Sequence, residues 1–299
     1  MSTSSIKVLV HGAGSAQGRA VVSALLAAGH RVRALVRRPE AAPVIAGVSL
    51  ETAIGDLSDA TSLQAASQGV DAVYVHVPAS VPTAVMADYA GAALLAAREA
   101  GVRRAALTVS SVVPDAPVGI PGPDMRRAMV DRALSVLPST TVLSVTLYLE
   151  NFSLALRQAI EFGGAIPQAV PADVPVSYLS MADQARYAVA ALESGAAAGR
   201  LVRLGGADAL TGEQLAKLFT SVIGRPVEYQ YIPPEGMVGF LTPIVGPQIA
   251  AQISEMYAWE GSTGRDLLVP DVDAARRLLG VSPSSTGAWI REHFVPVAS

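Results

Sequence analysis

The 299-residue chain contains no cysteine. This absence excludes disulfide bonds, thiolate nucleophiles and metal sites built on cysteine. Its four histidines, His11, His30, His76 and His293, lie far apart and show no paired ligand spacing. We therefore expect no metal site of any kind.

The sequence also lacks a strong excess of one charge. Its net charge is −3, and the arginines occur as scattered doublets rather than as one basic stripe. A nucleic-acid-binding surface needs a concentrated positive potential, so we expect no nucleic-acid partner.

No segment of the sequence is suited to span a membrane. The most apolar late segment, 237–253, is interrupted by Pro243, Pro247 and Gln248, whereas a span needs about twenty apolar residues. We interpret it as a buried or pocket-lining helical region. The N-terminus has no basic region leading into an apolar secretory segment, so we expect a cytoplasmic protein without a membrane partner.

Apolar runs alternate with helix-like segments up to about residue 150. Beyond a first strand near residue 8 and a second at 31–36, we expect strands at 48–54, 72–77, 105–109 and 142–147, and helices at 59–67, 81–100 and 123–137. This alternation predicts an α/β fold with a Rossmann-type, doubly wound parallel sheet.

The order of elements loosens after residue 150. We expect short strands at 175–179, 201–204 and 227–232, and helices at 181–193, 211–223 and 271–279. The chain is therefore interpreted as two lobes: a Rossmann domain over 1–150 and a smaller α/β lobe over 151–299, where a substrate would bind. Some exchange of strands or helices between the lobes is expected.

Residues 8–18 are the most informative segment, because an apolar run leads into a small-residue loop and then into a helical pattern. That order is typical of a dinucleotide-binding turn. Gly12 permits the sharp reversal, Gly14 lets the main chain approach a pyrophosphate, and Gly18 permits close packing of helix on sheet. Ser15 is suited to cap the helix and to hydrogen-bond a phosphate. The alternative is an ordinary tight turn without a ligand.

The residues after the second strand bear on the choice of nucleotide. That strand is followed by Arg37 and Arg38 rather than by an acidic residue. An acid there would bind the ribose 2′-hydroxyl of NAD, whereas a guanidinium suits a 2′-phosphate through its charge and planar donors. We therefore predict NADPH or NADP+ as the cofactor. The alternative is a solvated arginine pair at a strand end.

Five separated segments carry a family resemblance. They are GAGSAQG at 12–18, VRRP at 36–39, GDLSD at 55–59, LENF at 149–152 and VSYLSMAD at 176–183. Together they resemble the NmrA-like group of atypical short-chain dehydrogenases. The resemblance implies a cleft between the lobes that binds NADP(H), with Gln17 in the turn, Asp56 and Leu57 beside the adenine, and Asn151 on the substrate side.

One departure from the short-chain dehydrogenases concerns their Tyr-x-x-x-Lys pair, in which the cation lowers the pKa of the phenol. The helix expected at 123–137 contains neither a tyrosine nor a lysine. Some relatives carry a lysine on this helix, with an acidic residue four positions later. Arg127 and Asp131 resemble that pair in position. Arg127 keeps the charge and can bind a ribose hydroxyl, but an arginine is a poor proton donor.

Three side chains remain as catalytic candidates. His76 ends the fourth strand beside Val77 and Pro78, so all three are expected near the cofactor, where the histidine could donate a proton. Ser110 ends the fifth strand and could orient a carbonyl oxygen. Tyr148 is the best remaining phenol on the substrate side. Each has a plain alternative: a structural histidine, a strand-end serine and a tyrosine packed between the lobes.

Two aromatic residues late in the chain are candidates for substrate binding. We expect Tyr257 and Trp259, with the segment 237–241, to form the apolar wall of a pocket for an aromatic substrate. The alternative is a hydrophobic core with an aromatic edge.

These features predict an NADPH-dependent oxidoreductase that transfers hydride to a small, aromatic or quinonoid carbonyl substrate. Such acceptors delocalise the charge of the product and need no strong protein acid. The alternative is a non-catalytic NADP(H)-sensing regulator that acts through a protein partner. A homodimer is compatible with either function.

Overall fold

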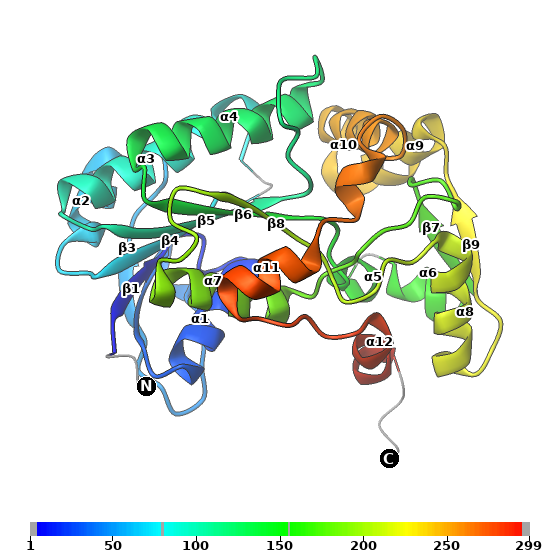
Figure 1. The fold of residues 1–299 in the computed structure, drawn as a ribbon, viewed down its shortest axis with the longest axis horizontal. Helices are drawn as coiled ribbons and strands as arrows, with labels where there is room; N and C mark the ends of the chain where they lie inside the picture. The colour runs from blue at the N-terminus through cyan, green and yellow to red at the C-terminus, as the bar shows by residue number, and fades with distance from the viewer. Residues whose placement is uncertain (1–4, 79–80, 155, 295–299) are drawn as a thin grey trace.

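The computed structural model describes residues 5–78, 81–154 and 156–294, and its centre is a parallel β-sheet (Figure 1). Seven strands lie in the order β3-β2-β1-β4-β5-β6-β8. They are β1 (Lys7–Val10), β2 (Arg31–Val36), β3 (Glu51–Ile54), β4 (Ala72–His76), β5 (Arg104–Ser110), β6 (Thr140–Val145) and β8 (Leu201–Leu204). The order reverses between β1 and β4, which is the switch point of a doubly wound sheet. The predicted Rossmann-type α/β fold is confirmed.

Helices cover both faces of this sheet (Figure 1). One face carries α2 (Ala60–Ser67), α3 (Met86–Glu99) and α4 (Pro121–Val136); the other carries α1 (Ala16–Ala27), α7 (Met181–Ser194) and α11 (Val272–Leu279). Every residue of β4 and β6 is buried. Strands that are buried on both faces consist largely of apolar residues in sequence, and this pattern allowed their prediction.

The ends of α2 and α3 are set by residues directly beside them in the sequence. The Asp59 carboxylate accepts the Thr61 amide at 3.0 Å and starts α2. Gly101, with φ of +81°, follows α3 in the left-handed region that favours glycine.

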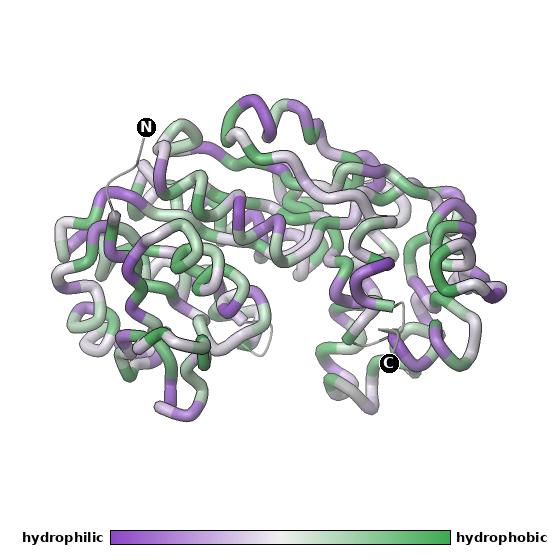
Figure 2. Tube along the Cα trace, turned by 90° about the horizontal axis from the view of Figure 1, so that it is seen from below, coloured by the Kyte–Doolittle hydropathy of each residue, from purple (hydrophilic) through white to green (hydrophobic). Residues whose placement is uncertain are grey.

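The second lobe is built around a smaller apolar core. It contains the parallel pair β7 (Ala165–Gln168) and β9 (Glu228–Tyr231), with α5 (Glu150–Leu154), α6 (Arg157–Glu161), α8 (Gly212–Ile223), α9 (Pro234–Val245), α10 (Pro247–Glu260) and α12 (Thr286–Phe294). Phe152 and Phe219 pack edge to face at its centre, 5.4 Å between ring centroids. Seen from below, the two lobes lie side by side and are joined along one edge (Figure 2).

Three elements that follow residue 150 nevertheless pack in the first lobe. β8 pairs in parallel with β6, and α7 and α11 lie on the face of the sheet that α1 covers. Residues 201–204 therefore belong to the central sheet, although they follow the lobe boundary predicted at residue 150. They extend the central sheet, because the edge of the fully buried β6 needs a hydrogen-bonding partner.

Two expectations of secondary structure are wrong. Residues 175–179 form isolated bridges, Tyr148 with Leu179 and Val176 with Leu210, rather than a strand. Their apolar pattern comes from burial in the second core. The helix expected from residue 81 begins only at Met86, after the short 3-10 helix η2 (Thr83–Val85), because Pro82 holds the chain extended there.

None of the helices in the described part of the chain combines the length and the apolar character that crossing a bilayer requires.

Candidate functional site

The turn between β1 and α1 is so tight that it excludes side chains at three glycines. A Cβ on Gly12, whose φ is +71°, would lie 2.7 Å from the carbonyl oxygen of His76. A Cβ on Gly14 would lie 2.8 Å from the Ala41 carbonyl oxygen, and one on Gly18 would lie 2.1 Å from the Gly12 carbonyl oxygen. Gly18 thus brings α1 directly against the turn, as the sequence predicted.

The start of α1 presents free backbone donors. The Ser15 hydroxyl accepts the Gly18 amide at 3.1 Å and donates to the Gly12 carbonyl at 2.8 Å, which confirms Ser15 as the helix cap. Among the described residues, no acceptor meets the amides of Ala13, Gly14, Ala16 and Gln17. Free amides at the positive end of a helix form an anion site, so the turn fits the pyrophosphate of a dinucleotide.

The charged groups expected around the ribose lie at the ends of β2 and β3. Arg37 and Arg38 are both exposed, and Arg38 Nε lies 3.4 Å from Glu40 Oε1. Hydrogen bonds from the Ser58 hydroxyl and amide, with a smaller contribution from the charge of Arg37, lower the pKa of Asp56. Two exposed guanidinium groups are therefore available to an anion at this strand end.

A cavity of about 310 Å³ lies where the glycine turn, the carboxyl ends of β4, β5 and β6, and helices α4 and α10 meet. The predicted site residues that line it are Gln17, His76, Val77, Ser110, Tyr148, Asn151 and Tyr257. The two helices add an apolar wall of Met125, Met129, Ile253 and Met256. The fold thus gathers candidate cofactor, catalytic and substrate residues at one place, at the strand ends where such sheets bind ligands.

Other predicted residues do not line this cavity, and neither does the segment 237–241, so the apolar wall expected there comes from α4 and α10 instead. Arg127 pairs with Asp131 at 2.5 Å on another side of α4. Trp259 is buried in the core of the second lobe, and Pro78 lies just outside the lining. A step of one residue turns a helix by about 100°, so α4 directs Arg126 rather than Arg127 into the cavity.

The three catalytic candidates are all electrically neutral at neutral pH. Burial lowers the pKa of His76 to about 4, and its Nδ1 has no partner in the described residues. Burial raises the pKa of the Tyr148 phenol far more than its neighbours Ser110 and Gln17 lower it. The Ser110 hydroxyl accepts a hydrogen bond from Gln17 Nε2 at 3.2 Å. No cation activates Tyr148, so it does not reproduce the missing Tyr-Lys pair.

The structure reveals two polar residues of the cavity lining, Arg126 and Ser111, and a third behind them, Glu260, that the sequence interpretation missed. Arg126 Nε donates to the Ser110 carbonyl at 2.7 Å, and Nη2 lies 2.9 Å from Met256 Sδ. The Ser111 hydroxyl, beside Ser110 in the lining, donates a hydrogen bond to Glu260. Glu260 is completely buried at the end of α10.

The charges of this cluster depend on burial. Burial raises the pKa of Glu260 to about 7, although the charge of Arg126 and the Ser111 hydroxyl oppose the shift. Burial also lowers the pKa of Arg126. The only sequence signal was weak: Arg126 adjoins the predicted Arg127, and Glu260 follows Trp259. Their contact with residues about 130 to 150 positions away could not be read from spacing.

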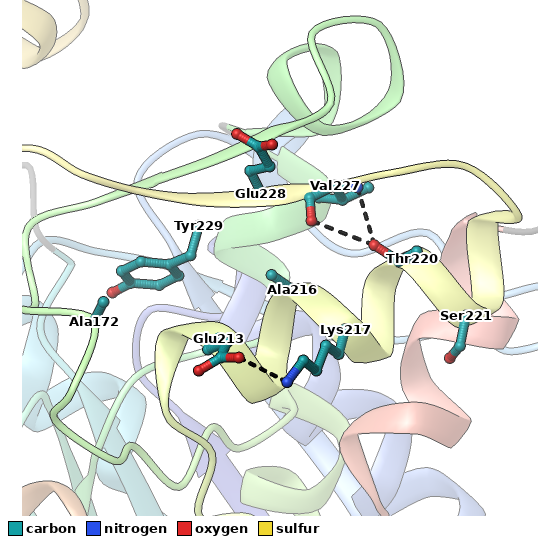
Figure 3. Close-up of a pocket in the computed structure, with 9 residues that line it drawn as sticks. All are labelled: Ala172, Glu213, Ala216, Lys217, Thr220, Ser221, Val227, Glu228 and Tyr229. Atoms are coloured by element: carbon teal, nitrogen blue, oxygen red, sulfur yellow. Dashed lines mark hydrogen bonds and ion pairs between the residues drawn. The ribbon is translucent and has the colours of Figure 1, made fainter.

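A second cavity, of about 520 Å³, lies between α8 and β9 and contains none of the predicted residues (Figure 3). Several of its polar side chains already have partners: Lys217 Nζ lies 2.7 Å from Glu213 Oε1, and Thr220 exchanges hydrogen bonds with the main chain of Val227. Tyr229 donates to a backbone carbonyl. We therefore assign the functional site to the cavity at the carboxyl ends of β4, β5 and β6, although it is the smaller of the two.

In the described part of the chain, no three His, Asp or Glu side chains are grouped so that they could hold a metal ion.

Comparisons with known proteins identify related chains over nearly the whole length. The model of the NmrA-like family matches residues 4–279. A (4-alkanoyl-5-oxo-2,5-dihydrofuran-3-yl)methyl phosphate reductase of Streptomyces griseus is 30% identical over 96% of this chain and 97% of its own. An NAD(P)H azoreductase of Xenophilus azovorans is 29% identical, with 84% and 86% of the two chains covered. Among solved structures, an NADPH-dependent quinone oxidoreductase of Escherichia coli in complex with NADPH has a TM-score of 0.79 at 21% identity, with 96% and 100% covered.

Proposed function

Because the chain belongs to the NmrA-like family, we propose that it is an NADPH-dependent oxidoreductase that transfers hydride to a small, aromatic or quinonoid carbonyl compound. One observation carries the proposal: a single cavity runs from Gln17 of the glycine turn to Asn151 and Tyr257 of the second lobe. A dinucleotide held at the turn would direct its nicotinamide into this cavity.

The cofactor would be held by the turn and by the arginines after β2. The free amides of the turn meet the pyrophosphate, and Arg37 and Arg38 meet the 2′-phosphate. Asp56 and Leu57 border the adenine. The chain has no acidic residue directly after β2 that would bind the ribose 2′-hydroxyl of NADH. Its absence favours NADPH over NADH.

The cofactor supplies the hydride, and the residues of the cavity orient its acceptor. The Ser110 hydroxyl and the neutral His76 ring are placed to hydrogen-bond an acceptor oxygen. The apolar wall from α4 and α10 excludes water and suits a flat, aromatic acceptor.

The known relatives support this class of reaction. The two similar sequences are named for reduction of a furanone phosphate and of azo compounds, and the similar structure is named for reduction of quinones.

The test is oxidation of NADPH by the purified protein with a panel of quinones, aromatic aldehydes and enones, beside calorimetric binding of NADPH and NADH. Turnover with any of these acceptors establishes the oxidoreductase. Binding of NADPH without turnover would favour a non-catalytic NADP(H)-sensing regulator. Binding of neither nucleotide would contradict both functions.

A charge reversal tests the preference for NADPH. Arg37→Glu replaces an attraction to the 2′-phosphate by a repulsion, and a hydrogen bond to a charged group contributes about 1.5–3 kcal/mol. We expect NADPH affinity to fall by at least about tenfold, with NADH affinity changed by less than about twofold. Arg31→Glu is the matched control, because Arg31 is exposed at the opposite end of the same strand. Equal losses for both nucleotides in Arg37→Glu would refute the assignment.

A further inference from the structure

We propose that Ser111 and Glu260 form a proton relay that delivers a proton to the carbonyl oxygen of the substrate. The proposal rests on the reductase function proposed above. The relay would take over the role of proton donor that the missing Tyr-Lys pair has in short-chain dehydrogenases. The catalytic group is Ser111, which reaches the cavity, and Glu260 acts through it.

The first argument is the position of the two groups. Ser111 lines the cavity directly after β5, next to Ser110. Its hydroxyl donates to Glu260 Oε1, and the second carboxyl oxygen, Oε2, has no partner among the described residues. A buried carboxyl group that is only half satisfied costs free energy, so its presence calls for a function.

The second argument is the backbone of Ser111. Its φ is +74°, and it is the only residue other than glycine with a positive φ in the described part of the chain. This conformation is unfavourable for a residue with a side chain and tends to occur at functional sites. The Ser144 hydroxyl donates to the Ser111 carbonyl at 3.3 Å and supports this conformation.

The third argument is the charge around Glu260. Among the described residues, Arg126 of α4 and Tyr257 of α10 itself interact electrostatically with Glu260. Because burial raises the pKa of Glu260 to about 7, a large share of the molecules hold this proton at neutral pH. Arg126 then stabilises the carboxylate that remains after the proton has left.

Other charged groups lie on the elements packed against α10, and several of them are paired elsewhere. Asp124 of α4 accepts two backbone amides, and Arg127 of the same helix pairs with Asp131. On the 3-10 helix η3 (Arg265–Leu268), Arg265 lies 3.5 Å from Asp173. The remaining charged residues of the helices packed against α10 are Arg132 of α4, Glu235 of α9 and Asp266 of η3.

The proton transfer accompanies hydride transfer. The hydride forms a C–H bond at the carbonyl carbon, and the π-electron pair of the C=O bond moves to the oxygen. For this step the Ser111 hydroxyl turns from Glu260 toward the substrate and gives its proton to that oxygen, while the serine oxygen takes the carboxyl proton of the protonated Glu260. The product is an alcohol, and the Glu260 carboxylate regains a proton from water before the next turnover.

Two variants remove the relay in different ways. Glu260→Gln keeps a hydrogen-bonding group beside Ser111 but holds no transferable proton. Ser111→Gly removes the hydroxyl, and glycine readily adopts φ of +74°. Glu255→Gln is the control, because Glu255 is an exposed carboxylate on the same helix. NADPH affinity and thermal unfolding establish that each variant is folded.

The assay compares two acceptors across pH. One is the carbonyl compound that the unaltered protein reduces fastest, and the other is a cationic triarylmethane dye, which accepts hydride and needs no proton. We expect both relay variants to lose about 100-fold in carbonyl reduction, the usual size of a general-acid effect. The loss lies in kcat rather than KM, and dye reduction changes by less than about twofold.

The pH profile separates a relay from a structural role. Carbonyl reduction by the unaltered protein falls as the pH rises through about 7, and Glu260→Gln removes that fall. An unchanged profile in Glu260→Gln, or an equal loss with both acceptors, would overturn the relay and leave the reductase function intact. Failure of the unaltered protein to reduce any acceptor would overturn the proposed function and the relay with it.

Discussion

Substitution of Gly18 by alanine tests the packing that creates the nucleotide-binding turn. The new Cβ would lie 2.1 Å from the Gly12 carbonyl oxygen and 2.8 Å from the Ala13 Cα, both of them backbone atoms that no rotamer change can move away. An ordinary contact needs about 3.5 Å, so α1 has to retreat from the turn by on the order of 1 Å.

The cost of that retreat can be worked from the contacts that change. The cap from Ser15 Oγ to the Gly18 amide, 3.1 Å long, contributes about 1 kcal/mol. Displacing the fully buried Val21, Val22 and Leu25 costs about 1–3 kcal/mol, and the better helix propensity of alanine returns up to about 1 kcal/mol. We expect a net loss of about 2–3 kcal/mol, which lowers Tm by about 3–5 °C in a chain of this length.

Binding should suffer more than stability. If α1 moves away, two amide contacts to the pyrophosphate at about 1.5 kcal/mol each are lost, which corresponds to about 100-fold weaker NADPH binding. Calorimetry and thermal unfolding measure the two effects. Gly239→Ala is the control, since a Cβ there meets nothing within 4 Å, and it should leave both values unchanged or raise Tm slightly. Unchanged NADPH affinity and Tm in Gly18→Ala would refute the reasoning.

Three further substitutions have definite expected outcomes. Tyr148→Phe should change carbonyl reduction by less than about threefold, because burial raises the pKa of this phenol and no cation activates it; a loss above about tenfold at unchanged NADPH affinity would restore Tyr148 as the proton donor. Burial lowers the pKa of His11 from 6.5 to about 4, so its contribution to stability is complete above pH 6.5 and is lost as the pH falls toward 4. His11→Leu should therefore reduce by about 3 kcal/mol the fall in the free energy of unfolding between these pH values, measured by urea unfolding. An unchanged dependence of that free energy on pH would contradict this. The contribution of Glu260 to stability depends on pH in the opposite direction, because burial raises its pKa from 4.5 to about 7 and the contribution is lost as the pH rises. The free energy of unfolding of Glu260→Gln, relative to that of the unaltered protein, should increase by about 3 kcal/mol between about pH 5 and about pH 8. A difference that stays constant with pH would exclude the raised pKa.

Local chemistry explains why much of the first lobe could be predicted from sequence. Strands buried on both faces appear as apolar runs, and the turn after β1 needs glycine at Gly12 and Gly18 whatever the rest of the chain does. Asp59 and Ser15 cap the helices that follow them because a cap needs only neighbouring residues.

The second lobe was harder to predict because its elements depend on distant partners. The apolar pattern of 175–179 was interpreted as a strand, but the segment is buried in a core without a continuous partner strand. β8 follows the lobe boundary predicted at residue 150, yet it pairs with β6 about sixty positions earlier. Neither outcome follows from periodicity, which reports burial and not the identity of the neighbour.

The sequence by itself determined the α/β alternation, the glycine turn, the helix caps and the arginines that follow β2, because each depends on residues within a few positions of one another. Only the tertiary structure decided which residues meet in the cavity. It brought Arg126 of α4 rather than Arg127 to the site, and it placed Glu260 of α10 against Ser111 at the end of β5. The physical reason is that burial and long-range contact, which set the pKa of Glu260 and the direction of each side chain, exist only once the two lobes have packed together.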